Sequence, residues 1–407
     1  MFLHIDINSY FASVMQQENP FLRGKPVGVV KSEGRTCIIA ASKEAKKYGV
    51  KTGSNTYEAK KLIPSIILVP AQFDLYWHCT KKLKSLFESI TPDCEIFSLD
   101  EAFIPLDNCK YLYKDPHELA LKIQDRVKEE LGEWVTCNVG ISHNRLLAKI
   151  ASEIAPKGMI FEINEENKDK ILKEVEFKDV CGVGSRLEAR LSVFGVKHPY
   201  EINSLSDEAL QKHFGSFLSY ELRKIGRGEG SYILDRIDEN EHMKNVGRTI
   251  TGYRLCNSED TIRKVLYNLM EEVTFKVRKM DMAGRYVQIF LQGEDKSWHA
   301  HKTLKYFVRH TNEMFNLLYH DGYKKWKRNF SVIRYGVGLG MLRPLNKTPL
   351  PLFDDWYKRE RLYEAVDKIS EKFGLFTLHS GILSEKEIIR PEVTGYLGDK
   401  KYQFGNN

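Results

Sequence analysis

Three carboxylates constrain this chain more than any other feature, because they stand at the ends of strand-like segments. Asp6 ends a short apolar run, and Asp100 and Glu101 are adjacent between strand-like runs at residues 95–99 and 102–106. A strand interior disfavours Asp and Glu. Like charges brought together in a partly buried place also repel, so that one of them would have to take up a proton. The chain must therefore expose these residues, as a turn cap and a hairpin tip, or neutralise them.

A divalent cation would neutralise the three carboxylates. Mg²⁺ prefers hard oxygen ligands of this kind. Three carboxylates suit a pair of metal ions about 3.5–4 Å apart, one activating an attacking hydroxyl and the other stabilising a leaving phosphate. An aromatic pair, Tyr10 and Phe11, follows shortly after Asp6. Taken together, these residues favour a two-metal site over an unrelated cap and hairpin tip.

Two segments carry a family resemblance. DINSYFASV at residues 6–14, followed by SLDEAF at residues 98–103, resembles the catalytic core of the Y-family (translesion) DNA polymerases, and the closer similarity is to their UmuC-like bacterial branch. The resemblance implies error-prone, DNA-templated synthesis past damaged bases, with a mutator effect in the SOS response and without a proofreading exonuclease.

The resemblance also implies the chemistry of the carboxylates. Asp6, Asp100 and Glu101 would hold two Mg²⁺ ions, with the backbone carbonyl of Ile7 as a further ligand. The primer 3′-hydroxyl would attack the α-phosphate of a deoxynucleoside triphosphate in line, and pyrophosphate would leave. Catalysis of this kind consists mainly of charge neutralisation and positioning.

The implied fold is α+β and multidomain, with the architecture of a right-hand polymerase. Strand, helix, strand, strand, helix, strand is the ferredoxin-like pattern expected of its palm. Apolar residues at three- and four-residue spacing predict a long helix over Phe73–Ile90. The expected domains are the palm at 1–19 and 77–165, small fingers at 20–76, a helix–hairpin–helix thumb at 166–235, a βαββαβ little finger at 240–345, and a C-terminal tail at 346–407.

Three lysines are implied to bind the triphosphate of the nucleotide. Lys43 and Lys46 occupy positions where many family members carry Tyr and Arg. Lys binds phosphate as a point charge, without the bidentate fork of Arg. We favour Lys46, because Lys43 replaces an aromatic residue and would also be stable in solvent. Lys157 lies in the sequence Ala-Pro-Lys-Gly at 155–158, a shorter and reordered form of the family's Lys-Pro turn, and would reach the β- and γ-phosphates.

The aromatic pair after Asp6 has two interpretations. In the family, the second aromatic lies beneath the sugar of the incoming nucleotide and leaves no room for a 2′-hydroxyl. Phe11 matches that position and is expected to exclude ribonucleotides. Tyr10 is the neighbouring candidate in the nucleotide site, and we favour an ordinary core role for it.

A glycine turn predicts a contact with primer–template DNA. VCGVGSRLEARLSVFGV at residues 180–196 is typical of a helix–hairpin–helix. Its turn, Gly182-Val183-Gly184, would direct backbone N–H groups and a helix N-terminus at a DNA phosphate. The alternative is a turn between packed helices that contacts no ligand.

The segment 241–345 is strongly basic. It holds 19 Lys and Arg against 10 Asp and Glu, a formal charge of +9, whereas the rest of the chain carries −2. Such a local charge favours a polyanionic partner. Strands are expected at 248–256, 285–291 and 330–341, and helices at 260–280 and 305–318.

Within this segment, two-residue alternation places Arg248 and Arg254 on one face of the first strand, with Tyr253 and Leu255 facing the core. Arg248 would then bind a DNA phosphate from an open sheet face. The alternative is that the arginines are merely solvated. Sequence-independent binding of this kind would be salt-sensitive.

The tail begins with KTPLPLF at residues 347–353, which resembles the sliding-clamp peptide of bacterial polymerases. Leu350, Leu352 and Phe353 would be its apolar anchors, and Pro349 replaces the expected Gln. An apolar linker is the alternative. The residues that follow, 359–374, predict an amphipathic helix.

Composition indicates where such a protein works. It has 407 residues, 42% of them hydrophobic, which is enough for several domain cores. Seven scattered cysteines without a CxxC pair argue for a reducing compartment and against a disulfide framework or a zinc site. Because the sequence has no signal peptide and no apolar stretch of membrane-spanning length, we expect a cytoplasmic monomer without a membrane partner.

Two other functions remain open. A nucleotidyl cyclase also uses paired palm carboxylates, but it has no use for a helix–hairpin–helix or a basic domain. A non-catalytic DNA-binding relative would retain the scaffold. The intact carboxylates speak against that relative, and the departures at Lys43, Lys46 and Pro156-Lys157 leave it open.

Overall fold

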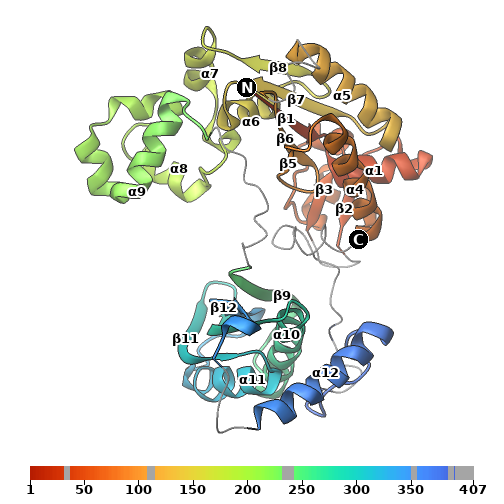
Figure 1. The fold of residues 1–407 in the computed structure, drawn as a ribbon, viewed down its shortest axis with the longest axis vertical. Helices are drawn as coiled ribbons and strands as arrows, with labels where there is room; N and C mark the ends of the chain where they lie inside the picture. Colours follow the sequence, from red (N-terminus) through yellow and green to blue (C-terminus); the bar gives the residue numbers. More distant parts are fainter. Residues whose placement is uncertain (32–36, 108–114, 232–242, 350–354, 384–388, 390–407) are drawn as a thin grey trace. The chain divides into compact units, whose positions relative to one another are not determined.

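The computed structural model describes residues 1–31, 37–107, 115–231, 243–349, 355–383 and 389. The chain forms two compact units, Met1–Arg236 and Ile237–Asn407 (Figure 1). Helices in the described part of the chain do not combine the length and apolar composition that a membrane crossing requires.

A five-stranded sheet with the order β5-β6-β1-β7-β8 organises the first unit. Its strands are β1 (Phe2–Ile7), β5 (Glu95–Ile96), β6 (Glu101–Pro105), β7 (Cys137–Ser142) and β8 (Ile160–Ile163). The central strand, β1, is antiparallel to both of its neighbours. Its residues are buried apart from Asp6, which is partly exposed. Strand β1 is therefore accessible to solvent at Asp6, near its C-terminal end.

Four helices accompany this sheet: α1 (Tyr10–Glu18), α4 (Phe73–Ile90), α5 (Pro116–Leu131) and α6 (Arg145–Ile154). The predicted bounds of α4 are confirmed. Helix α6 lies directly on β7, because Gly140 has no side chain there. A Cβ atom at Gly140 would stand 2.0 Å from the carbonyl oxygen of Ala148 and 2.5 Å from the nitrogen of Ser152.

A smaller sheet with the order β3-β2-β4 follows α1. It consists of β2 (Val27–Val30), β3 (Ile38–Ala41) and β4 (Ile67–Pro70), accompanied by the helical turn η1 (Pro20–Leu22) and the helices α2 (Lys43–Lys46) and α3 (Thr56–Leu62). Its own small core includes Val30, Ile38, Val50 and Ile63.

The rest of the first unit is helical: α7 (Lys168–Glu174), η2 (Phe177–Asp179), α8 (Ser185–Ser192), η3 (Pro199–Ser204) and α9 (Asp207–Arg227). Its core continues into α6 through Leu147 and Ile150. Gly182 (φ 94°) and Gly195 (φ 77°) adopt the left-handed conformation on either side of α8, as a helix–hairpin–helix requires.

The second unit contains the βαββαβ series β9 (Asn245–Cys256), α10 (Glu259–Lys279), β10 (Met282–Gln292), β11 (Ser297–Val308), α11 (Thr311–His320) and β12 (Val332–Gly340). The sheet order is β11-β10-β12-β9, with all neighbours antiparallel. Helices α10 and α11 pack on one face of this sheet and form its core (Figure 1). The helical turn η4 (Tyr323–Lys325) lies between α11 and β12, and β13 (Arg343–Pro344) and η5 (Leu345–Lys347) follow β12.

The prediction of a helix over 305–318 was partly wrong, because strand β11 continues to Val308 and α11 begins at Thr311. The alternating exposure of β11 between Ser297 and His301 marks it as a strand, whereas apolar residues further on fit both periods. The helix predicted over 359–374 is confirmed as α12 (Trp356–Phe373).

Candidate active site

Strand pairing brings the three predicted carboxylates to the same place. Asp6 on β1 lies opposite Glu101 on β6, and the N–H of Ile7 donates to the carbonyl oxygen of Asp100 at 3.0 Å. On the other side of β1, Asp6 lies opposite Asn138 of β7. The two sequence motifs are therefore joined by the sheet at the point where both carry acidic residues.

A pocket of ≈ 340 Å³ opens at this point. It is lined by Asp6, Ile7, Ser9, Tyr10, Phe11, Ile39, Ala40, Ala41, Lys46, Thr52, Asp100, Glu153 and Lys157. Most of the predicted catalytic and nucleotide-binding residues thus share one pocket. Glu101 lies beside it, with a carboxylate oxygen within 4.8 Å of oxygens of both Asp6 and Glu153.

The carboxylates strongly influence one another's ionisation. Burial, followed by the charges of Asp100, Glu153 and Glu101, raises the pKa of Asp6 from 3.8 to about 8. Burial also raises the pKa of Asp100, against a hydrogen bond of 2.6 Å from the Ser98 hydroxyl. Because all the donors are hard oxygens and the carboxylates repel one another at close range, the residues fit a divalent cation.

Glu153 is a member of this group that the sequence did not reveal. It lies on α6, one turn after Lys149, whose ammonium group is 3.5 Å from a Glu153 carboxylate oxygen. The same ammonium group donates a hydrogen bond to Glu101. Burial alone would lower the pKa of Lys149, but Glu101 outweighs it and the net pKa is raised. Lys149 therefore remains charged and holds Glu101 in place.

The turn with the reordered motif does deliver its lysine to the pocket. The buried side chain of Asn138 donates to the carbonyl oxygens of Ser152 (2.9 Å) and Ala155 (3.0 Å) and accepts from the N–H of Gly158 (2.7 Å). These bonds fix the end of α6 and the turn that carries Lys157. The Lys157 charge in turn lowers the pKa of Asp6, against the larger effects that raise it.

The two fingers lysines are separated by the structure. Lys46 lines the pocket, and burial, followed by the Lys157 charge, lowers its pKa. The Lys43 ammonium group instead lies 4.7 Å from the ring centroid of Trp134. The preference for Lys46 over Lys43 agrees with this placement.

The aromatic pair also divides. Phe11 stacks on Tyr76, with ring centroids 4.3 Å apart and an angle of 19°, and stands at the pocket wall. Tyr10 is buried, and its hydroxyl donates to the carbonyl oxygen of Tyr76 (2.7 Å) and shares a 2.9 Å hydrogen bond with Thr80. Tyr10 therefore has the core role that we favoured, although part of it reaches the pocket.

The predicted DNA-binding turn is partly committed to internal bonds. The N–H of Val183 donates to the carbonyl oxygen of Val180 at 3.2 Å, and Val183 itself is buried. Around Gly182 and Gly184 the space is open, since a Cβ atom on either would meet nothing within 4 Å. A phosphate would thus approach these two glycines rather than Val183.

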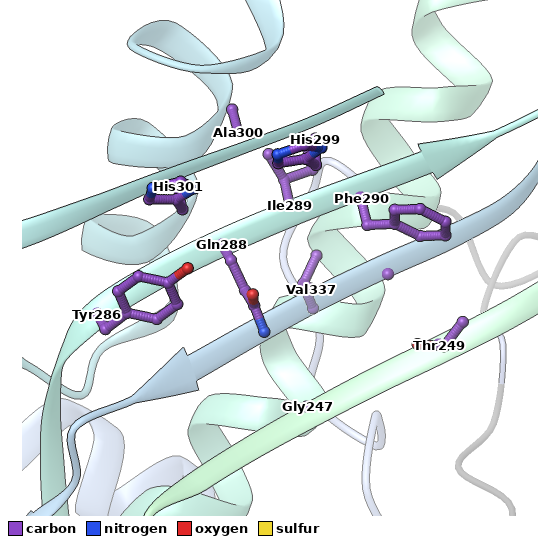
Figure 2. Close-up of a pocket in the computed structure, with 11 residues that line it drawn as sticks. Gly247, Thr249, Tyr286, Gln288, Ile289, Phe290, His299, Ala300, His301 and Val337 are labelled. Atoms are coloured by element: carbon purple, nitrogen blue, oxygen red, sulfur yellow. The ribbon is translucent and has the colours of Figure 1, made fainter. Parts of the chain in front are cut away.

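The uncovered face of the second unit's sheet carries other residues of β9 than those predicted. It carries a hollow of ≈ 330 Å³ lined by residues of β9 to β12, among them Thr249, Tyr286, Gln288, Phe290, His299 and His301 (Figure 2). The placement of Arg248 on this face was wrong: Arg248 faces α10, where its Nε donates to Glu272 at 2.7 Å. The core position expected for Leu255 was also wrong, since Leu255 is 45% exposed.

The predicted clamp-binding residues Leu350, Leu352 and Phe353 lie outside the residues that the structure describes. The helix after them, α12, is joined to α10 by a bidentate ion pair between Arg278 and Asp367, at 2.7 and 2.8 Å.

Comparison with known proteins adds to this geometry. The model of the impB/mucB/samB family matches residues 5–153, and the model of that family's C-terminal domain matches residues 243–352. DNA polymerase IV of Acetivibrio thermocellus is 30% identical over 389 residues, covering 94% of this chain and 96% of the relative. DNA polymerase IV of Pelotomaculum thermopropionicum is 31% identical over 375 residues, covering 91% and 92%. A solved insertion ternary complex of Dbh DNA polymerase is similar at a TM-score of 0.56 and 25% identity, covering 84% of this chain and 98% of that one.

Proposed function

Because the chain belongs to the Y-family DNA polymerases, the impB/mucB/samB family, we propose that it extends primers past damaged template bases by a two-Mg²⁺ mechanism at Asp6, Asp100 and Glu101. Membership confirms the right-hand fold and DNA-directed DNA polymerase activity. The observation that carries the mechanism is the convergence of Asp6, Asp100, Lys46 and Lys157 at one pocket, with Glu101 beside it. The UmuC-like branch stays a prediction, since both curated relatives described above are named DNA polymerase IV.

The carboxylates and the Ile7 carbonyl would hold the metal ions. Bound Mg²⁺ would supply Lewis-acid activation of the primer 3′-hydroxyl and neutralise charge on the triphosphate. Lys149 keeps Glu101 oriented toward Asp6, and the hydrogen bond from Ser98 keeps Asp100 oriented. Fixed ligands of this kind reduce the reorganisation that the reaction would otherwise require.

The remaining pocket residues would bind the nucleotide. Lys46 on α2 and Lys157 in the turn after α6 both line the pocket and would neutralise the triphosphate as point charges. Phe11, fixed by its stacking on Tyr76, would lie beneath the sugar and exclude a 2′-hydroxyl. Lys43 is a weaker candidate, because its charge is engaged by Trp134.

We also propose the domain roles: palm at 1–19 and 77–165, fingers at 20–76, thumb at 166–235, little finger at 240–345, and tail at 346–407. The turn at Gly182–Gly184 and the open sheet face around Tyr286 and His301 are the candidate contacts with primer–template DNA. Low fidelity without proofreading, an SOS role and a sliding-clamp partner remain predictions of the same proposal.

Primer extension tests the proposal. The wild type and Asp100→Asn are compared with Mg²⁺ on an undamaged template and on one with an abasic site. We expect the wild type to extend both primers and Asp100→Asn to extend neither. DNA binding measured in parallel should be retained by the variant. If both proteins extend equally, the assigned site is wrong; if neither extends but both bind DNA, the chain is a non-catalytic relative.

A further inference from the structure

A buried glutamine connects the fingers to the palm. Gln16 lies on α1 and is 2% exposed. Its side-chain Nε2 is within hydrogen-bonding distance of the carbonyl oxygens of Leu22 (3.1 Å) and Lys25 (3.3 Å), and of a carboxylate oxygen of Glu44 on α2 (3.1 Å). Its Oε1 accepts from the indole N–H of Trp134 at 3.0 Å. One amide thus bonds to the chain entering the fingers, to α2 and to the loop before β7.

Trp134 extends this connection. Its ring contacts two cations of the fingers region, with the Lys43 ammonium 4.7 Å and the Arg23 guanidinium 5.7 Å from the ring centroid. Arg23 also donates to the carbonyl oxygens of Gln16 (3.0 Å) and Gln17 (2.9 Å). Cation–π contacts and hydrogen bonds therefore join the same two parts of the chain.

Helix α2 needs such support. It has only four residues, so its internal hydrogen bonds cannot fix its direction. Two of its side chains, Lys43 and Glu44, are held by the palm through Trp134 and Gln16. A third, Lys46, lines the carboxylate pocket. The bonds of its helical neighbours therefore contribute to the position of Lys46 relative to Asp6, together with the N-cap Ser42 and the buried Ala45.

We propose that Gln16 is a positioning residue for the incoming nucleotide: its amide joins palm to fingers and holds α2 so that Lys46 faces the catalytic carboxylates. The inference rests on the proposed nucleotide site. Gln16 is not among the residues that line the pocket of the catalytic carboxylates. Its loss should accordingly weaken nucleotide binding while leaving the chemistry of the bound nucleotide intact.

The test compares Gln16→Met with Gln17→Met in primer extension. Met approximates the volume of Gln without its hydrogen bonds. Gln17 is a matched control, because it is the next residue of α1 and its side chain also bonds Trp134, through the backbone N–H at 2.9 Å. We expect Gln16→Met to raise the nucleotide KM by about fivefold to tenfold with kcat within about twofold, as the loss of one or two hydrogen bonds predicts. Gln17→Met should change neither constant.

A charge exchange gives a second readout. In Gln16→Glu, the new carboxylate would face Glu44 and two carbonyl oxygens, so KM should rise at least as much as in Gln16→Met. Adding Glu44→Gln restores a donor opposite the carboxylate, and KM should return part of the way to the wild-type value. A role in stability alone would not produce this rescue in KM.

The outcomes separate the two hypotheses. Primer extension by the wild type and by Asp100→Asn is measured first. If the wild type does not extend, or if Asp100→Asn extends as well as the wild type, the proposed function is contradicted. If the wild type extends and Gln16→Met leaves KM unchanged, the inference about Gln16 fails by itself. It also fails if KM and kcat change equally in Gln16→Met and Gln17→Met, or if the double variant shows no recovery.

Discussion

Gly140→Ala is expected to disrupt the active site by displacing helix α6, which packs on strand β7 at Gly140. The added Cβ would stand 2.0 Å from the carbonyl oxygen of Ala148, 2.5 Å from the nitrogen of Ser152 and 3.0 Å from the Cβ of Ala151. Ordinary contact begins at 3.4 Å, so the nearest atom is 1.4 Å too close. Two of the three atoms belong to the α6 backbone and cannot rotate away. The whole helix must therefore move.

The expected cost follows from this displacement. Overpacking of a well-packed core costs about 1–3 kcal/mol, and more where backbone must shift. For a unit of this size, that cost lowers Tm by about 2–12 °C. Helix α6 also carries Lys149 and Glu153 to the carboxylates. Misplacement of catalytic groups by about 1 Å can reduce catalysis about a hundredfold. Polymerase activity should therefore be reduced even at temperatures below the lowered Tm, where the variant is still folded.

Differential scanning calorimetry and primer extension at 20 °C would measure both effects. Gly381→Ala is the control, because a Cβ atom there would meet nothing within 4 Å. We expect Gly381→Ala to melt and extend primers like the wild type. If Gly140→Ala did the same, the close approach of α6 to β7, and its role in holding the site, would be refuted.

Three further predictions concern the other sites. Metal-free protein should lose stability as pH rises from about 4 to 8: burial and the Asp100 charge raise the pKa of Asp6 from 3.8 to about 8, so the unfolded chain releases this proton at lower pH than the folded protein. Urea unfolding in EDTA measures the slope of unfolding free energy against pH, which Asp6→Asn should flatten; equal slopes in both proteins would contradict the assignment. Phe11→Val should admit ribonucleotides, raising their kcat/KM relative to deoxynucleotides by about tenfold or more. Unchanged discrimination would show that Phe11 does not lie beneath the sugar of the nucleotide. Arg248→Ala should destabilise the second unit by about 3 kcal/mol, because it removes the cation that pairs with the largely buried Glu272 carboxylate. DNA affinity measured on folded protein should hardly change, and a large loss of affinity at unchanged stability would show that Arg248 contacts DNA.

The sequence alone located the carboxylates that we propose as catalytic. Asp6 and Asp100–Glu101 are recognisable because acidic residues at the ends of buried strands are a local anomaly, visible without knowing what they pack against. The long helix α4 was likewise predictable, since its apolar spacing is a property of one segment. Local patterns of this kind determine which elements form and where acidic residues interrupt them.

Tertiary structure decided which side chains meet those elements. Alternation cannot decide which face of its strand Arg248 takes, because the choice depends on which side α10 covers, and a strand pattern is the same from either side. Glu153 and Lys149 reach the carboxylates because Gly140 lets α6 approach β7. Gln16 gains its role from partners up to 118 positions away. Contacts between distant segments are fixed by packing, and for that reason no single stretch of the sequence announces them.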